Sequence, residues 1–280
     1  MFLLIKLFYC DNIKETVMEA LWSMKFENIL VIICVVIGVA VVCAVCAFFA
    51  RKRKKNEFIN QPVNLPESFT YTAHTGCAGT EANSLGSIEA GVKYSAGIVE
   101  FDLNFNKNGD PVLSHDAPKG GEVTLDEAFK KISEYENLRV NVDIKSTVAL
   151  EKIRPAAEKY GVAERIFYTG VHDGFVDAVR SNGGGVDYYL NVSVELKNKH
   201  TEKYLMSLVQ KVKDSGAIGI NFNKNNASKA LVDTFHANGL LVSIWTVDKK
   251  FDMYRVLSYA PDNITTRHPD KLGALIKSLI

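Results

Sequence analysis

Cysteine and net charge are both scarce in this sequence. Of the 5 cysteines in 280 residues, Cys10, Cys34, Cys43 and Cys46 come before residue 50, and Cys77 is the only one that follows. A lone cysteine cannot build a disulfide framework, so the larger part of the chain is not a disulfide-stapled domain. The formal net charge is only +1, which gives no support to a nucleic-acid-binding role.

Charge and proline are absent from residues 29–50. As a helix, these 22 residues span roughly 33 Å, which matches the hydrocarbon core of a bilayer. A cleaved signal peptide is the competing interpretation, but the run is longer than a usual signal core and a basic block follows it where a cleavage site should be. The sequence therefore predicts a single transmembrane helix.

The basic block Arg51–Lys55 follows this run at once, and the preceding side carries few positive charges. The positive-inside rule then predicts a single-pass cell-membrane protein whose following domain faces the cytoplasm. The expected organisation is an N-terminal segment without assigned function (1–28), a transmembrane helix (29–50), a basic juxtamembrane linker (51–66) and a folded domain (67–280).

In the folded domain, short apolar runs alternate with helical stretches, which is typical of parallel βα units. Two helix starts carry capping signals, Asn83 before residues 84–94 and Thr124 with Glu127 before residues 125–135. Eight such units predict a TIM (β/α)8 barrel. The expected strands are Tyr71–His74, Ile98–Leu103, Arg139–Ile144, Arg165–Thr169, Tyr188–Val192, Ala217–Asn221, Leu241–Val247 and Asn263–Thr266.

A hairpin is expected within residues 99–116, because Asn108-Gly109 is typical of a two-residue type I′ turn between alternating strands. With that turn, Asp102 faces His115 across the hairpin. The alternation places Glu100 and Asp102 on one face and the apolar residues on the other. Two carboxylates and an imidazole are therefore expected to converge.

Residues 141–145, which overlap the expected strand Arg139–Ile144, alternate between polar and apolar side chains. This alternation places Asp143 and Lys145 on one face. Glu100, Asp102 and Asp143 on neighbouring strands then form a cluster of oxygen ligands, whose mutual repulsion a hard divalent cation relieves. The predicted cofactor is Mg²⁺ or Ca²⁺.

These motifs together resemble the glycerophosphodiester phosphodiesterase family, which is related to the sphingomyelinase D type phospholipases. The resemblance covers about one barrel domain. The matching motifs occur in the family's order, namely His74-Thr75-Gly76, Ala82-Asn83-Ser84, Glu100-Phe101-Asp102, His115-Asp116, Asp143-Ile144-Lys145 and Trp245-Thr246.

The resemblance implies a role for each matched position. Glu100, Asp102 and Asp143 would bind the metal, and His74 and His115 would act as general acid and base. Substrate contacts are implied for Lys145, Trp245 and the position of Thr75, although Trp245 is equally well explained as a residue that closes the barrel. The other histidines, His172, His200, His236 and His268, are expected to be structural.

Three positions depart from the family pattern. Thr75 replaces an arginine that would bind phosphate bidentately, and Ala82 replaces a glutamate. Asp143 stands where the phosphodiesterases have glutamate and the sphingomyelinase D type has aspartate. If the pocket keeps the family geometry, an arginine at position 75 should strengthen phosphate binding; a phosphate contact by Arg267 is an open alternative.

The expected function is a membrane-anchored, metal-dependent phosphodiesterase that hydrolyses glycerophosphodiesters to an alcohol and glycerol phosphate. Its substrate would be a glycerophosphodiester or a phospholipid-derived molecule, and neither a nucleic-acid nor a protein partner is inferred. Two alternatives stay open. One is a phospholipase D-like lyase that forms a cyclic phosphate, and the other is a catalytically weakened barrel that binds a phosphodiester or lipid.

Overall fold

The structure is a computed structural model that describes residues 26–59, 63–198 and 200–279. Most of the N-terminal segment predicted at 1–28 lies outside the described residues, as does Cys10. The chain forms two compact units, Met1–Glu57 and Phe58–Ile280.

In the first unit, helix α2 (Phe26–Ile59) contains the predicted apolar span. Leu30–Ala50, 21 residues with a mean hydropathy of 3.3, is long and apolar enough to cross a membrane. The helix continues through the basic block, so residues 51–59 of the predicted linker are helical. Lysine and arginine are good helix formers, which explains why the helix does not end at residue 50.

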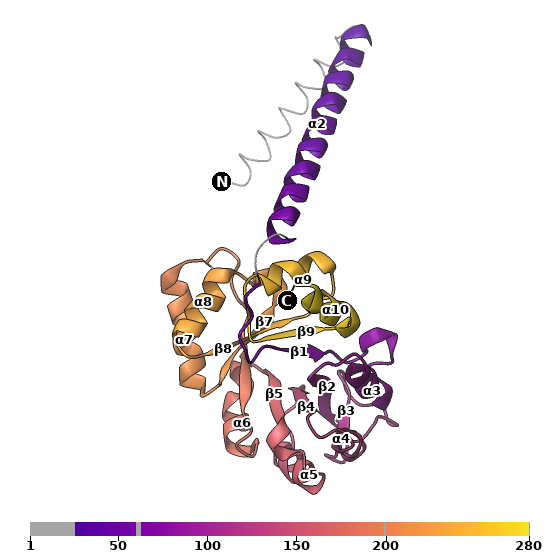
Figure 1. Cartoon of the computed structure of the whole chain (residues 1–280), viewed down its shortest axis with the longest axis vertical. Helices are drawn as coiled ribbons and strands as arrows, with labels where there is room; N and C mark the ends of the chain where they lie inside the picture. Colours follow the sequence, from indigo (N-terminus) through magenta and orange to yellow (C-terminus); the bar gives the residue numbers. More distant parts are fainter. Residues whose placement is uncertain (1–25, 60–62, 199, 280) are drawn as a thin grey trace, which may run out of the picture. The chain divides into compact units, whose positions relative to one another are not determined.

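In the second unit, eight described parallel strands close into a barrel (Figure 1). Each strand pairs with the next along the chain, and β1 pairs with both β2 and β9, which closes the sheet. The predicted TIM barrel is confirmed, and each expected strand overlaps an observed one. The strands are β1 (Thr70–Ala73), β2 (Ile98–Phe105), β4 (Arg139–Ile144), β5 (Ile166–Val171), β6 (Tyr188–Asn191), β7 (Gly219–Asn223), β8 (Leu241–Trp245) and β9 (Asn263–Thr266).

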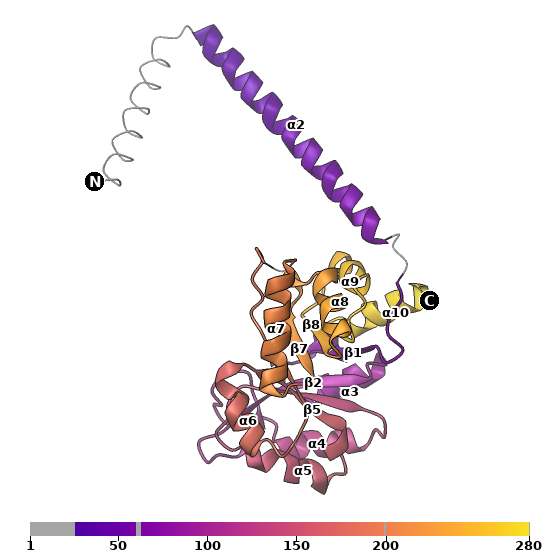
Figure 2. The ribbon, with the colours of Figure 1, turned by 90° about the vertical axis from the view of Figure 1, so that its left-hand side faces the viewer.

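The helices surround the strands (Figure 2). The capping box at Thr124 and Glu127 is confirmed, and such a cap stabilises a helix by about 1 kcal/mol. The expected cap at Asn83 is wrong, because the Ser84 side chain accepts the hydrogen bond from the Ser87 N–H. The barrel helices are α3 (Leu85–Lys93), α4 (Leu125–Ser133), α5 (Ile153–Lys159), α6 (Val176–Asn182), α7 (Glu202–Ser215), α8 (Lys229–Ala237), α9 (Lys250–Leu257) and α10 (Pro269–Leu279).

The alternation along β2 separates the core from the barrel interior. Val99, Phe101 and Leu103 belong to the main core cluster, and the Phe101 ring packs 6.3 Å from Phe129 of α4. Each fully buried side chain of this size contributes roughly 1.5–3 kcal/mol. The residues between them point into the barrel, where the neighbours of Glu100 and Asp102 are mostly polar. The apolar core therefore stabilises the fold without filling the carboxyl ends of the strands.

The hairpin of β2 and β3 (Pro111–Leu113) is observed, but its predicted register is wrong by one residue. Leu103 pairs with Leu113 rather than facing Ser114. The connection is a three-residue loop, in which Gly109 has a φ of 74° and donates its N–H to the Asn106 carbonyl. A type I turn followed by a left-handed glycine is the usual form of such a loop.

Asn106 explains why this turn forms instead of the two-residue one. Its side-chain oxygen accepts hydrogen bonds of 2.9 Å from the N–H groups of Asn108 and Asp110. Such a local side-chain cap stabilises the turn that starts at the asparagine. The predicted pairing of Asp102 with His115 is therefore wrong, and the Asp102 carbonyl accepts from the Ser114 N–H instead.

Candidate active site

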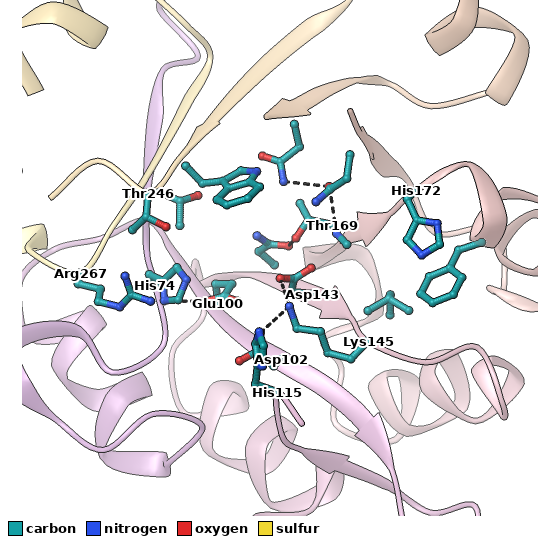
Figure 3. A pocket seen from close by; sticks show the side chains of 18 residues that line it. His74, Glu100, Asp102, His115, Asp143, Lys145, Thr169, His172, Thr246 and Arg267 are labelled. Atoms are coloured by element: carbon teal, nitrogen blue, oxygen red, sulfur yellow. Dashed lines mark hydrogen bonds and ion pairs between the residues drawn. The ribbon is translucent and has the colours of Figure 1, made fainter. Parts of the chain in front are cut away.

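A cavity of about 460 Å³ lies at the carboxyl ends of the barrel strands (Figure 3). Among the described residues, seven of the eight predicted site residues line it. The exception is Thr75. The cavity is lined by His74, Glu100, Asp102, His115, Asn141, Asp143, Ile144, Lys145, Thr169, Gly170, His172, Phe175, Asn191, Asn221, Trp245, Thr246, Thr265 and Arg267.

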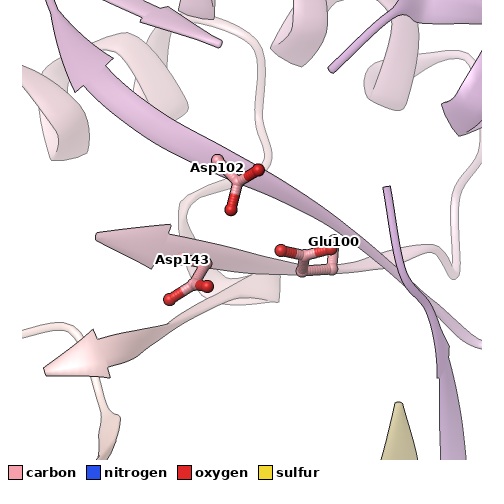
Figure 4. Close-up of side chains that lie close together, drawn as sticks. All are labelled: Glu100, Asp102 and Asp143. Carbon is pink, nitrogen blue, oxygen red and sulfur yellow. The ribbon is translucent and has the colours of Figure 1, made fainter. Parts of the chain in front are cut away.

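Three carboxylates meet in this cavity, as Figure 4 shows. Glu100 and Asp102 lie two residues apart on β2, and Asp143 is the register partner of Asp102 on β4. One oxygen from each group lies within 4.8 Å of the others. Burial, and secondarily the charge of Asp102, raises the pKa of Glu100 well above its usual value, and burial also raises the pKa of Asp143.

Lys145 neutralises part of this charge. Its Nζ lies 2.9 Å from Asp102 Oδ1 and 2.7 Å from Asp143 Oδ2. Burial acts to lower the pKa of Lys145, but the charges of Asp143 and Asp102 outweigh it and raise that pKa above its usual value. One ammonium among three carboxylates leaves the cluster with an excess of negative charge.

Asn83 and Thr75 hold two of the carboxylates from behind. Asn83, with a φ of 57°, donates its Nδ2 to Asp102 Oδ2 at 3.0 Å, and its Oδ1 accepts from the Asp102 N–H. The Thr75 N–H donates to Glu100 Oε2 at 2.7 Å, while its hydroxyl accepts from the Asn83 N–H. Thr75 is only 4% exposed, so it supports the carboxylates rather than facing the cavity.

The cluster fits a hard divalent cation. Asp143 Oδ1 is buried and has no hydrogen-bond partner among the described residues. An unsatisfied buried carboxylate oxygen is costly, and a cation bound by several oxygens removes that cost. Both the donor set and the uncompensated charge therefore suit Mg²⁺ or Ca²⁺.

His74 follows β1 and is largely buried at the cavity wall. Its Nδ1 lies 2.9 Å from the Thr75 carbonyl oxygen. Because a carbonyl oxygen only accepts, Nδ1 carries the proton, and Nε2 is the basic nitrogen of the neutral ring. Burial lowers the pKa of His74, which favours this neutral form.

His115 follows β3 and is 69% exposed at the mouth of the cavity. Its Nδ1 lies 2.8 Å from Asp116 Oδ1, and this hydrogen bond lowers the pKa of Asp116. The structure thus places both predicted histidines on one cavity, with the first in the wall and the second at the rim.

Several lining residues were missed by the sequence analysis. Thr169, Asn191 and Asn221 lie on β5, β6 and β7 and face the cavity. The alternation of polar and apolar residues along these strands is a signal that could have indicated them. His172, expected to be structural, also lines the cavity, and its ring packs 4.0 Å from that of Phe175. The wall away from the carboxylates is therefore polar and partly aromatic.

Two groups of this wall lack partners within the described chain. The Trp245 Nε1–H and Asn221 Oδ1 are buried without a hydrogen bond. The orientation of the Asn221 amide follows from its neighbours, because the Gly170 N–H donates to Asn191 Oδ1, and Asn221 Nδ2 donates to that same oxygen at 3.0 Å. The wall therefore contains one buried donor and one buried acceptor without a partner among the described residues.

Comparisons with known proteins agree with this geometry. The profile of the glycerophosphoryl diester phosphodiesterase family matches residues 119–271. The chain belongs to this family. The expected family is thereby confirmed, and membership identifies the chain as a phosphoric diester hydrolase. The matched span contains Asp143, Lys145 and Trp245, whereas His74 and the β2 carboxylates precede it.

Individual members of the glycerophosphoryl diester phosphodiesterase family are distant in sequence. A glycerophosphodiester phosphodiesterase from Caldanaerobacter subterraneus is 24% identical in an alignment of 233 residues that covers 70% of this chain and 92% of the relative. A solved structure from Galdieria sulphuraria, assigned the same activity, has a TM-score of 0.62 at 21% identity and covers 77% of this chain and 99% of its own.

A third relative carries a ligand. The structure of an Oleispira antarctica phosphodiesterase in complex with the product sn-glycerol-3-phosphate has a TM-score of 0.60 at 17% identity, covering 76% of this chain and 97% of its own. At this level of identity the solved structures establish the shared barrel.

Proposed function

We propose that this protein is a membrane-anchored, metal-dependent phosphodiesterase that hydrolyses glycerophosphodiesters to an alcohol and glycerol phosphate. The observation that carries the proposal is the buried cluster of Glu100, Asp102 and Asp143, with an unsatisfied oxygen, in one cavity with two imidazoles. A phosphodiester needs charge neutralisation and two proton transfers to be hydrolysed. The carboxylates would hold the cation that neutralises the charge, and the imidazoles would carry out the proton transfers.

Glu100, Asp102 and Asp143 would hold the divalent cation, Mg²⁺ or Ca²⁺. When bound, it supplies neutralisation of the charge on the phosphodiester oxygens. Lys145 would contribute a second positive charge from the same side of the cavity, since its Nζ already lies between two of the three carboxylates. The substrate phosphate would therefore bind in the cavity next to the three carboxylates and Lys145.

The two histidines differ in a way that suggests their roles. His74 is buried, and its pKa is lowered, so the ring is neutral and Nε2 can accept the proton of the attacking water. His115 lies at the exposed mouth of the cavity, where the hydrogen bond between its Nδ1 and the Asp116 carboxylate orients the ring for the role of proton donor to the leaving alkoxide. His74 is thus proposed as general base and His115 as general acid.

The polar wall would receive the alcohol part of the substrate. A hydroxyl group can accept from the Trp245 Nε1–H and donate to Asn221 Oδ1, the two unused groups there. The glycerol phosphate product of the Oleispira antarctica relative carries such hydroxyl groups. Both observations favour a polyhydroxylated substrate over a purely apolar one.

Membrane anchoring rests on the sequence and on α2. Residues 29–50 would span the cell membrane once, and the basic block Arg51–Lys55 would place the catalytic domain in the cytoplasm. The proposed organisation keeps residues 1–28 without assigned function, residues 51–66 as a partly helical juxtamembrane segment and residues 67–280 as the catalytic barrel.

The test uses the full chain in detergent micelles with a panel of glycerophosphodiesters and lysophospholipids. Alcohol release is measured with Mg²⁺, with Ca²⁺ and with chelator, beside the variants His115→Ala and Asp102→Asn. We expect turnover that needs metal and is lost in both variants. Turnover that persists in Asp102→Asn with chelator would contradict the assignment of Asp102 as a metal ligand.

The same samples separate hydrolysis from the lyase reaction, which the presence of aspartate at position 143 favours as a second candidate. Phosphorus NMR distinguishes a glycerol phosphate monoester from a cyclic phosphate. A cyclic phosphate as the final product would replace the hydrolase by the lyase. Phosphodiester binding without any turnover would instead favour the weakened barrel.

A further inference from the structure

The cavity contains a second cationic side chain, Arg267, to which the proposed hydrolysis assigns no role. Among the described residues that line the cavity, the cationic side chains are Lys145 and Arg267. Lys145 is engaged by two carboxylates at 2.9 Å and 2.7 Å. Its three N–H groups are therefore largely committed to the metal ligands, and a bound phosphodiester would need another strong donor.

Position 75 cannot supply that donor. The Thr75 side chain is buried and its hydroxyl is bonded to Asn83 behind the carboxylates. An arginine there would lack the hydroxyl that accepts from the Asn83 N–H. That arginine at position 75 strengthens phosphate binding stays a prediction.

Arg267 is placed next to His74 by the closure of the barrel. Ala73 of β1 pairs with Thr266 of β9, so His74 and Arg267 are the next residues along the two paired strands. The His74 N–H donates to the Thr266 carbonyl at 2.9 Å. Figure 3 shows the Arg267 side chain reaching the same edge of the cavity as His74.

The backbone at Arg267 is held firmly, while its guanidinium is held loosely. The Arg267 N–H donates to Asp248 Oδ1 at 2.8 Å, which anchors the start of the side chain. Within the part of the chain that the structure describes, the guanidinium makes one long contact, Nη1 to Asp248 Oδ2 at 3.4 Å, and the side chain is 48% exposed. Most of its five N–H groups are thus available to a ligand in the cavity.

We infer that Arg267 is the phosphate-binding arginine of this enzyme, contacting the nonbridging oxygens of the phosphodiester from the His74 side of the cavity. Guanidinium matches two phosphate oxygens with two parallel hydrogen bonds, which an ammonium cannot do. This inference rests on the proposed phosphodiesterase function. It explains how the site operates with threonine at position 75, because the same charge reaches the substrate from β9 instead of from β1.

The test compares Arg267→Gln and Arg267→Lys with the matched control Lys271→Gln in the full chain. Lys271 lies four residues further on, and among the described cavity-lining residues it does not appear. The readouts are kcat and KM for glycerophosphocholine and the Kd of inorganic phosphate, by calorimetry in the presence of Mg²⁺. Melting curves check that each variant is folded.

Loss of hydrogen bonds to a charged group predicts a fall in kcat/KM of roughly 10- to 100-fold for Arg267→Gln, with a parallel weakening of phosphate binding. Arg267→Lys should recover only part of it, and Lys271→Gln should stay within about twofold of the wild type, because it lacks contact with the substrate. Equal losses in Arg267→Gln and Lys271→Gln, or no loss in either, would overturn the inference.

The outcomes also separate this inference from the proposed function. A wild-type chain that binds phosphate through Arg267 but turns over no phosphodiester would remove the enzyme and leave the binding role. Turnover by the wild type together with unchanged kinetics in Arg267→Gln would keep the proposed enzyme and overturn the role of Arg267. Absence of both phosphate binding and turnover in the wild type would overturn both.

Discussion

The side-chain amide of Asn83 clamps Asp102 at two points. Asn83 Nδ2 donates to Asp102 Oδ2, Asn83 Oδ1 accepts from the Asp102 N–H, and both hydrogen bonds are 3.0 Å long. The asparagine holds a left-handed conformation, which asparagine tolerates better than most residues. One residue thereby joins the turn after β1 to a predicted metal ligand on β2.

Asn83→Gly and Asn83→Ala separate the two contributions of this residue. Both variants lose the amide, so both should bind Mg²⁺ about tenfold more weakly, the effect of removing an outer-shell partner. Only alanine also carries the cost of a positive φ, roughly 1 kcal/mol, so its melting temperature should be the lower. Calorimetry and thermal melts give the two readouts. Unchanged affinity in Asn83→Gly would mean that Asp102 needs no clamp.

Gly170 on β5 lies directly against Asp143. A Cβ added at Gly170, whose φ is +74°, would clash with Asp143 Oδ1 and with the Ile144 carbonyl oxygen. Gly170→Ala should therefore displace the carboxylate and abolish metal binding and turnover. The matched control is Gly239→Ala, because Gly239 has a φ of +71° but no atom within 4 Å of such a Cβ. The control should lose roughly 1 kcal/mol of stability and keep its metal affinity, measured by the same titration.

Glu100 makes the stability of the metal-free protein depend on pH. Its pKa is raised well above the usual 4.5, so between these two values the folded state binds more protons than the unfolded state. Stability in chelator should accordingly fall as the pH rises through the raised pKa. Thermal melts from pH 4.5 upward should show this fall, and Glu100→Gln should flatten it. A melting temperature that rises over this range in wild type but not in Glu100→Gln would contradict the assignment.

Lys145→Met tests the balance of charge in the cluster. Without the ammonium, Asp102 and Asp143 lose the counter-ion that lies 2.9 Å and 2.7 Å from them in the metal-free state. Loss of one partner of a buried ion pair costs about 3 kcal/mol. The variant should melt well below the wild type in chelator and should gain more stability than the wild type from saturating Mg²⁺. Equal gains in the two proteins would indicate that Lys145 does not interact with the metal ligands.

Asn221→Ala tests the wall proposed to receive substrate hydroxyl groups. The variant removes the unused acceptor, and kcat/KM for glycerophosphocholine should fall about tenfold, the effect of losing one hydrogen bond of about 1.4 kcal/mol. Hydrolysis of bis(4-nitrophenyl) phosphate, which has no hydroxyl group, should be unchanged. Equal losses for both substrates would mean that Asn221 only supports the wall, for example through the hydrogen bond from its Nδ2 to Asn191 Oδ1.

The barrel strands and the reactive side chains were predictable from local residue patterns. Short apolar runs between helical stretches predicted the eight strands, and capping signals predicted helix starts. Both kinds of signal depend on local residue type. The motifs around Glu100, Asp102 and Asp143 predicted the carboxylate cluster, since parallel strands bring their carboxyl ends to one edge. The apolar span required only a count of uncharged residues.

How these groups lie relative to one another became clear only in the folded chain. The hairpin register depended on the Asn106 side chain, which capped a three-residue turn where the dipeptide Asn108-Gly109 favoured a two-residue one. Closure of β1 against β9 brought Arg267 to His74 across 193 positions of sequence, a proximity that no local pattern contains. Burial of Thr75 behind Asn83 removed that position from the cavity. The approach of Arg267 to His74 follows from packing between distant segments. The hairpin register follows from competition between two local turn signals, of which the Asn106 side chain favoured the longer loop.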